Sequence, residues 1–476
     1  MTEAASIPNV LAQRYASPAM RSIWDPAAKI LAQRDLWIAV LRAQQSAGLP
    51  VSDEVIADYA AVRGQVDPMS IERRERVLKH DVKAAIEEFN ALAGHEAIHV
   101  GMTSRDLTEN IEQMQVMASL VLVRDKSVAA LALLAVRAQE FDDLAVTGRS
   151  HNVPAQLTTV GKRFASVAEE LLLAVERVES LIARYPLRGI KGPVGTAQDM
   201  LELVDGDVTR LDAIESAVAT LLGFPRLLTS VGQVYPRSLD YDALSALVQV
   251  ASAPATFATT LRLMAGQELA TEGFQEGQVG SSAMPHKMNA RSCERINGLH
   301  VVLRGYLAMV ADLSGQQWNE GDVSCSVVRR VALPDACFAI DGLLETFLTV
   351  LLDCGFFPAA IQREIDRNLP FLATTRILMA AVRQGTGREG AHQAIKDHAL
   401  AASRARQRGE ADIDLIADLA ADPRLNLTEG QLRELLDDPL SFTGDAHRQV
   451  DRVCAQIAEV VARHPVAAAY RPGAIL

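Results

Sequence analysis

The sequence predicts an all-α protein made of three helical domains, with a bundle of long helices at its centre. Aromatic residues make up only 5% of the chain while alanine and leucine are abundant, a composition that favours helices over sheets. Apolar residues also recur at helical spacing over several long segments. Helices of roughly 25–30 residues span about 40 Å or more, and several amphipathic helices of that length indicate a bundle.

The three domains follow from changes along the chain in apolar periodicity and in the frequency of proline and glycine. Residues 1–104 mix short helical stretches with proline and glycine breaks. Residues 105–355 form the predicted central bundle, and the break at Phe356-Phe357-Pro358 opens a smaller helical domain over 356–476. The long helices of the bundle are predicted over 107–145, 153–184, 207–222, 240–272, 291–313 and 329–352.

Composition and charge exclude several classes of protein. The net charge of −12 argues against a general nucleic-acid binder, which needs a basic face. The sequence contains no run of about 18 apolar residues, so it predicts no membrane span. Residues 1–9 lack the pattern of a secretory signal. The five cysteines form no C-x-x-C pair. We therefore expect a reduced, cytoplasmic protein without structural zinc or another metal.

The loop at residues 280–289 is the most informative stretch of the sequence. It reads Gly-Ser-Ser-Ala-Met-Pro-His-Lys-Met-Asn and separates two predicted helices. Glycine, hydroxyl residues and proline disfavour a helix, so a polar loop interrupts the helical core. It matches neither the nucleophile elbow of hydrolases nor a phosphate-binding P-loop.

Two histidines are candidates for acid–base work. His151 lies between Gly148 and Pro154, which predicts a turn at the start of a helix, where the dipole would disfavour its cationic form. His80 is predicted inside a helical stretch. A lone histidine is more often structural than catalytic, so both readings stay open at this point.

Other polar groups allow a structural and a functional reading. Thr103 with Asp106 predicts a capping box, while free N–H groups and hydroxyls there would suit a carboxylate or phosphate. Arg291 and Arg295 share one helix face, either as a solvated surface or as an anion clamp.

Taken together, these motifs resemble the fumarase/aspartase superfamily of lyases, and the Ala-Met-Pro-His-Lys version of the loop is most similar to its adenylosuccinate lyase family. The match covers nearly the whole chain, in the correct order. The segments that carry it are Arg14-Tyr15, Lys79-His80-Asp81, Thr103-Ser104-Arg105-Asp106, Gly148-Arg149-Ser150-His151, Gln233 and Gly280–Lys287.

The resemblance implies a helical homotetramer whose active sites each draw on three chains, acting without a cofactor. The implied reactions release fumarate from succinylated purine nucleotides by β-elimination. By analogy Ser281 is the base and His151 the acid, and Lys287 with Asn289 stabilises the developing carboxylate charge. His80 assists His151 or holds phosphate, and Glu294 orients one of these histidines. The implied substrate-binding residues are Arg14, Tyr15, Lys79, Asp81, Thr103, Ser104, Gln233, Met284, Asn289, Arg295, Ser326 and Arg330.

Two departures separate this chain from the family pattern. Met288-Asn289-Ala290 replaces the usual Arg-Asn-Pro after the loop lysine, and Gly321 replaces an arginine that contacts substrate. Arg329 is the neighbouring arginine expected to compensate. The alternatives are a sister lyase acting on argininosuccinate or a carboxymuconate lactone, and a non-catalytic oligomeric scaffold on the same fold.

Overall fold

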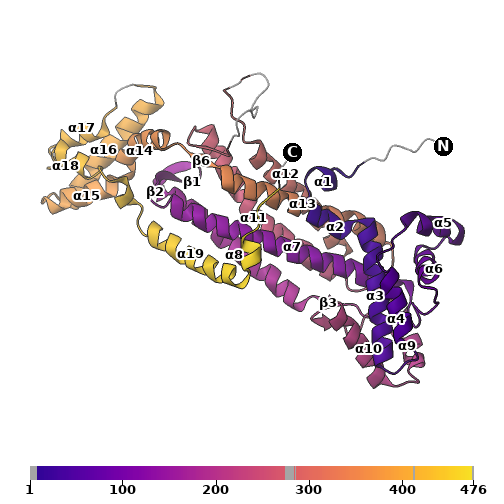
Figure 1. Cartoon of the computed structure of the whole chain (residues 1–476). Coiled ribbons are helices and arrows are strands. Elements are labelled where there is room, and N and C mark those ends of the chain that lie inside the picture. The colour runs from indigo at the N-terminus through magenta and orange to yellow at the C-terminus, as the bar shows by residue number, and fades with distance from the viewer. Residues whose placement is uncertain (1–7, 274–283, 285, 411–412, 474–476) are drawn as a thin grey trace.

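A computed structural model describes residues 8–273, 284, 286–410 and 413–473, and it confirms the all-α class (Figure 1). The helices are α1 Val10–Arg14, α2 Pro18–Trp24, α3 Pro26–Ser46, α4 Asp53–Val62, α5 Pro68–Leu78, α6 Asp81–Ala93, α7 Ser104–Glu140, α8 Val160–Arg184, α9 Gln198–Leu203, α10 Val208–Leu221, α11 Ser238–Gly266, α12 Arg291–Leu313, α13 Cys325–Asp353, α14 Pro358–Leu372, α15 Thr374–Arg383, α16 Arg388–Gln407, α17 Leu415–Ala420, α18 Glu429–Glu434, the short 3-10 helix η1 Pro439–Phe442, α19 Ala446–Arg463 and α20 Pro465–Ala468. The strands are β1 Ala145–Ser150, β2 Val153–Thr159, β3 Pro186–Leu187, β4 Arg226–Leu227, β5 Ala270–Thr271 and β6 Gly355–Phe356, and they form three two-stranded pairs.

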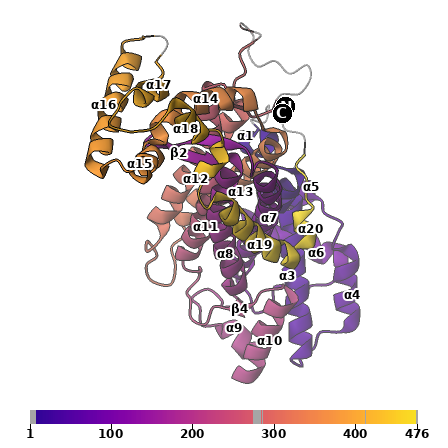
Figure 2. The same ribbon diagram turned by 90° about the vertical axis from the view of Figure 1, so that its left-hand side faces the viewer.

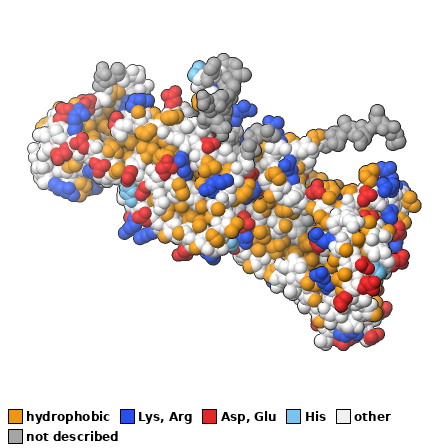
Figure 3. All heavy atoms as spheres, in the orientation of Figure 1, with side chains coloured by type: hydrophobic (Ala, Val, Ile, Leu, Met, Phe, Trp, Pro, Cys, Tyr) orange, Lys and Arg blue, Asp and Glu red, His pale blue; other side chains and the backbone are white. Residues whose placement is uncertain are grey.

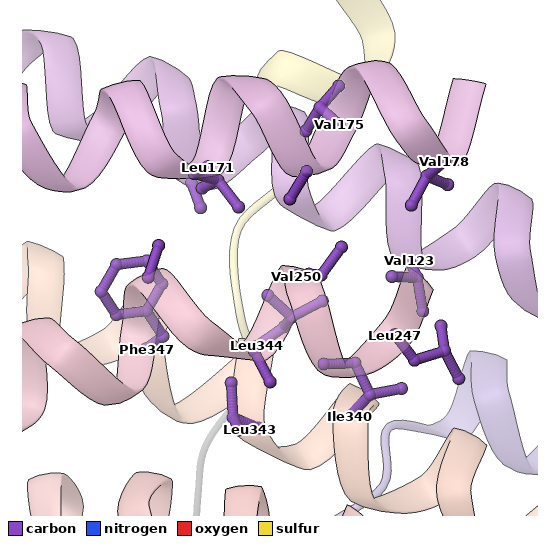
Figure 4. Packing of buried hydrophobic residues seen from close by; sticks show 14 of the residues in the cluster. Val123, Leu171, Val175, Val178, Leu247, Val250, Ile340, Leu343, Leu344 and Phe347 are labelled. Atoms are coloured by element: carbon purple, nitrogen blue, oxygen red, sulfur yellow. The ribbon is translucent and has the colours of Figure 1, made fainter. Parts of the chain in front are cut away.

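Five long helices, α7, α8, α11, α12 and α13, pack side by side as the central bundle. Their apolar faces meet in one core, where side chains of α7, α8, α11 and α13 interdigitate (Figure 4). Leu171, Leu247, Ile340 and Phe347 are at most 2% exposed there. Burial of this kind stabilises the fold by about 25 cal/mol per Å² of apolar surface.

Helix α7 sets the length of the molecule. It has 37 residues and therefore spans about 55 Å at 1.5 Å per residue. Helices α3 to α6 lie near its N-terminal end, and the β1–β2 hairpin follows its C-terminal end, with α14 to α18 beyond it (Figures 1 and 2). Helix α19 then returns along α7 and α8. The two ends of α7 thus lie in different surroundings.

The predicted helix over 153–184 is wrong in its first part. Val153–Thr159 is a strand that pairs antiparallel with β1, and the helix begins at Val160 with Thr159 as its N-cap. Pro154 lies beside the irregularity between Gly148 and Arg149, where a strand tolerates proline. The predicted helix over 240–272 likewise ends at Gly266, because the chain next forms β5.

Helix α11, Ser238–Gly266, is long and apolar enough by composition to cross a membrane. Here it packs against α8, α12 and α13 in the bundle, and 61% of its most apolar window is buried. The core helix of a globular protein meets the same criteria, so its burial explains its composition.

Candidate active site

The N-terminal end of α7 gathers the first group of predicted site residues. The Asp106 carboxylate accepts a hydrogen bond from the Thr103 backbone N–H at 2.8 Å, which confirms the predicted capping box. Thr103 and Ser104 are half-buried, so their hydroxyls remain within reach of a ligand. The helix start also carries a partial positive charge that favours anions.

His80 lies beside Ser104, but not inside a helix as predicted. It is the N-cap of α6, and its Nδ1 accepts a hydrogen bond from the Lys83 N–H at 3.2 Å. Its Nε2 lies 3.5 Å from the Ser104 Oγ. The helical prediction failed because Lys79 ends α5 in a left-handed conformation with φ of 54°, so that the chain turns before α6. Lys79 and Asp81 are both exposed.

Arg188 joins this helix start to the loop that carries Gln233. Its guanidinium donates to Asp106 at 2.5 Å and to the Gly232 carbonyl at 3.1 Å, and its side chain is fully buried. The Gln233 N–H in turn donates to the Glu320 carbonyl at 2.6 Å. The loops near residues 232 and 320 are therefore held against the start of α7.

A buried group of charges supports the same end one turn further along α7. Glu109 accepts hydrogen bonds from Arg237 and from the backbone of Tyr235. Burial alone would raise the pKa of Glu109, but the charges of Arg237 and Arg329 lower it below its ordinary value. This carboxylate is thus held ionised in the interior.

Arg329 belongs to this buried group, so the expectation that it compensates for Gly321 is wrong. Only 2% of it is exposed, and it binds Asp240 at 2.7 Å as well as Glu112 and Tyr235. The next residue, Arg330, is exposed. The adjacent arginines therefore face in different directions.

Sequence reasoning missed Arg105, which lies within the Thr103–Asp106 motif. Its guanidinium lies 3.4 Å from the Ser326 Oγ and connects α7 to the predicted substrate-binding serine at the start of α13. The sequence does not indicate this contact, because Ser326 is far from Arg105 along the chain. The only available signal was the arginine beside the Thr103 and Ser104 hydroxyls in the motif.

A second group of predicted residues meets farther along the bundle. The Arg295 guanidinium lies 5.7 Å from the centre of the Tyr15 ring, a cation–π contact between α12 and the chain end of α1. Burial lowers the pKa of Arg295 from its ordinary value. Arg14 is exposed nearby. Tyr15 packs against Gly342 of α13, where a Cβ would approach the Tyr15 Cβ to 2.7 Å. Gly342 is thus needed for the fit.

The base of the 280–289 loop is held by a buried carboxylate. Glu272 accepts hydrogen bonds from the Ser292 and Cys293 N–H groups, both at 2.9 Å, and so caps α12. The predicted base Ser281 lies outside the described residues. Met284 and Lys287 are exposed and Asn289 is half-buried.

A hollow of about 990 Å³ lies between this loop and α11, and Lys287 and Asn289 line it. Glu294 lines it too and pairs with Arg262 of α11 at 3.7 Å. Within one chain Glu294 therefore has an arginine as its charged neighbour, whereas the sequence predicts that it orients a histidine.

His151 forms the tip of the β1–β2 hairpin, which corrects the prediction of a turn at a helix start. His151 and Asn152 have φ of 52° and 61°, the positive values that a type I′ hairpin turn requires at both central residues. The imidazole is exposed, and it lies on a hairpin turn rather than at the start of a helix. Behind the tip, Arg149 binds Glu364 of α14.

One chain brings these residues into four groups and does not unite them. His80, Ser104 and Ser326 meet at the N-terminal end of α7, Tyr15 meets Arg295 along α12, and His151 follows the C-terminal end of α7. Lys287, Asn289 and Glu294 line the hollow beside α11. The length of α7 separates the first group from the third by about 55 Å. No single chain could place His80 and His151 on one small molecule.

Comparisons with known proteins agree with this architecture. Residues 17–305 match the Lyase family, and residues 370–453 match the family Adenylosuccinate lyase C-terminus. The 3-carboxy-cis,cis-muconate lactonizing enzyme from Pseudomonas putida has a similar fold, with a TM-score of 0.82, 21% identity, and coverage of 95% of this chain and 99% of that chain.

Relatives with higher identity cover nearly the whole chain. Adenylosuccinate lyase of Saccharomyces cerevisiae is 32% identical over 93% of this chain and 92% of its own length. Adenylosuccinate lyase of Schizosaccharomyces pombe is 31% identical over 95% of this chain and 94% of its own. Together with the two family matches, these similarities establish that the chain belongs to the adenylosuccinate lyase family of the fumarase/aspartase superfamily.

Proposed function

We propose that this protein is an adenylosuccinate lyase of purine nucleotide biosynthesis. It eliminates fumarate from adenylosuccinate to give AMP, and from the succinylated aminoimidazole carboxamide ribotide to give the free carboxamide ribotide. The observation that carries the proposal is the cluster of His80, Ser104 and Ser326 at the positively polarised start of α7. Its hydroxyls, imidazole and N–H groups suit a substrate with carboxylates and a phosphate.

The elimination needs a base, a group that stabilises charge, and an acid. Ser281 removes a proton from the succinyl carbon next to a carboxylate, and the electron pair forms the double bond of fumarate as the C–N bond breaks. Lys287 and Asn289 stabilise the charge that builds on that carboxylate. His151 donates a proton to the departing nitrogen, and Glu294 or His80 orients it.

The remaining residues of the proposed site bind substrate. Thr103 and Ser104 hold a succinyl carboxylate, and Ser326 lies towards the phosphate. The other residues proposed for substrate binding are Arg14, Tyr15, Lys79, Asp81, Gln233, Met284, Asn289, Arg295 and Arg330.

A homotetramer is proposed because one chain separates these groups. Copies of α7 packed antiparallel would bring the hairpin tip of one chain to the helix start of another. Large apolar side chains remain exposed on the bundle, among them Val301 of α12 and Val327 of α13, which are 67% and 71% exposed. Figure 3 shows further hydrophobic side chains over the middle of the molecule. A cytoplasmic enzyme with a small-molecule substrate follows from this proposal.

A direct assay tests the reaction. Purified protein is incubated with adenylosuccinate while the purine ultraviolet spectrum and fumarate release are followed, and size-exclusion chromatography with light scattering reports its assembly. We expect equimolar AMP and fumarate from a tetramer. A folded tetramer that instead splits argininosuccinate or opens the muconate lactone would assign a sister activity, and one that turns over none of them would identify a scaffold.

Complementation tests the shared site. Ser281→Ala and His151→Gln are each expected to reduce kcat by at least about 100-fold, since each removes a proton-transfer group. Co-refolding the two inactive variants should restore part of the activity, because some sites of a mixed tetramer receive both intact residues. Refolding each variant alone is the control. No recovery in tetramers shown by mass spectrometry to be mixed would contradict sharing.

A further inference from the structure

We propose that Arg105 binds the phosphate of the nucleotide substrate, an inference that rests on the proposed function. Arg105 lies in the first turn of α7, directly after Ser104. Its guanidinium is directed towards Ser326, the serine placed at the phosphate end of the substrate. Arginine suits this task because its planar fork can donate two parallel hydrogen bonds to phosphate oxygens.

The interactions that Arg105 makes within the chain leave its guanidinium available. One terminal nitrogen lies 3.4 Å from the Glu109 Oε1, and the other lies 3.4 Å from the Ser326 Oγ. Strong hydrogen bonds between charged groups measure about 2.7–2.9 Å. Arg237 already binds the same Glu109 carboxylate at 2.8 Å and 2.9 Å. Glu109 therefore holds Arg237 closely and Arg105 only loosely.

Exposure separates Arg105 from the other arginines around Glu109. Its side chain is 21% exposed, whereas those of Arg237 and Arg329 are 0% and 1% exposed. Arg329 is further engaged by Asp240, Glu112 and Tyr235. Arg105 is therefore the member of this group that can meet a ligand without leaving a buried carboxylate unpaired.

Position 321 offers no cation to the same region. It is a glycine, and a Cβ built on it would lie 3.0 Å from the Gln233 Cβ. The loop is thus packed closely against Gln233, whose N–H donates to the neighbouring Glu320 carbonyl. Arg105 adds a positive charge from α7 at this end of the substrate, next to the Ser326 hydroxyl.

Steady-state kinetics with adenylosuccinate test the role of Arg105. For Arg105→Gln we expect KM to rise about 10- to 100-fold, the loss typical of a hydrogen bond to a charged group, with kcat changed less than about threefold. Arg105→Lys should fall between, because it keeps the charge without the fork. Arg124→Gln is the matched control, since Arg124 lies on the same helix and is 20% exposed. It should leave KM unchanged.

A phosphate-free substrate separates binding from a structural role. With the dephosphorylated nucleoside of adenylosuccinate, wild type and Arg105→Gln should have equal kcat/KM. An equal loss on both substrates, or no loss on the nucleotide, would overturn the proposal. Glu109 keeps Arg237 and Arg329 in the variant, so we expect normal folding, checked by circular dichroism and tetramer size.

Failure of the proposed function gives a distinct result. If wild-type protein releases no fumarate from adenylosuccinate, calorimetry with AMP still tests the phosphate contact without turnover. Weaker AMP binding by Arg105→Gln than by wild type and Arg124→Gln would support it. Equal binding by all three, or no binding by wild type, would refute it.

Discussion

The two ends of α7 are built in contrasting ways. At the N-terminal end, Asp106 and Glu109 are fully buried and each binds an arginine that is itself buried. At the C-terminal end, His151 stands exposed on a two-residue turn. The end proposed to bind substrate is therefore fixed by the interior of one chain. The end proposed to donate the proton depends on a short turn, and in the proposed tetramer another chain would surround it.

The largest effect on stability is expected at the N-terminal end. Asp106→Asn would leave the buried Arg188 without its carboxylate, and we expect the free energy of unfolding to fall by about 3–5 kcal/mol. Urea unfolding followed by circular dichroism measures this change. Asp125→Asn is the control, because Asp125 lies on the same helix but is 35% exposed and should cost less than about 1 kcal/mol. Similar losses of unfolding free energy in both variants would show that the buried Asp106–Arg188 pair does not stabilise the protein more than an exposed pair does.

A smaller structural effect, seen mainly in activity, is expected at the hairpin. Asn152 has a φ of 61°, which a β-branched residue adopts only with strain, so Asn152→Val should displace the neighbouring His151. We expect kcat to fall about tenfold, while the free energy of unfolding falls by only about 1–3 kcal/mol. Asn152→Gly keeps the positive φ and should retain most activity. If the valine variant were fully active, the turn would not position the histidine.

The smallest effect concerns the pH dependence of stability at the N-terminal end. Burial lowers the pKa of His99 to about 4, and the Trp37 indole N–H donates to its Nδ1 at 3.1 Å. The unfolded chain binds a proton near pH 6.5, which the folded protein does not bind until about pH 4. The contribution of His99 to the free energy of unfolding is therefore fully present above pH 6.5, and it is lost as the pH falls towards 4.

His99→Gln should remove that dependence while keeping an acceptor for Trp37. We therefore expect the Tm difference between wild type and variant to shift in favour of the variant between pH 7.5 and pH 5. His95→Gln is the comparison, since His95 pairs with Asp58 on the same side of the molecule. A difference that stays constant with pH would show that His99 does not contribute.

The long helices were predictable because apolar periodicity continues over many turns in α7, α12 and α13. The hairpin was not, because Val153–Thr159 contains apolar residues that also fit a helix, and its strand pairing with Ala145–Ser150 is decided by tertiary contacts. Motif resemblance identified His80, Ser104 and Ser326 singly. Only the folded chain shows that they meet.

The fate of the arginines was the least predictable part of the site. The sequence places Arg329 and Arg330 side by side and gives no sign that Asp240 and Glu112, far apart in the chain, bury the first of them. Arg105 enters the sequence analysis only as a member of the Thr103–Asp106 segment, and its contact with Ser326 spans 221 positions. Pairing of charges over such separations is decided by three-dimensional packing, which helical periodicity does not encode.

The 37 residues of α7 also fix the distance between the helix start and the hairpin. Inserting one residue would lengthen the helix by about 1.5 Å and rotate everything beyond it by about 100°. In an assembly that joins the start of one α7 to the hairpin beyond the end of another, the same error would appear in every site at once. In such an assembly, activity would depend on the length of α7 as strictly as on the identity of the residues at its two ends. Surface loops could vary in length, whereas α7 could not.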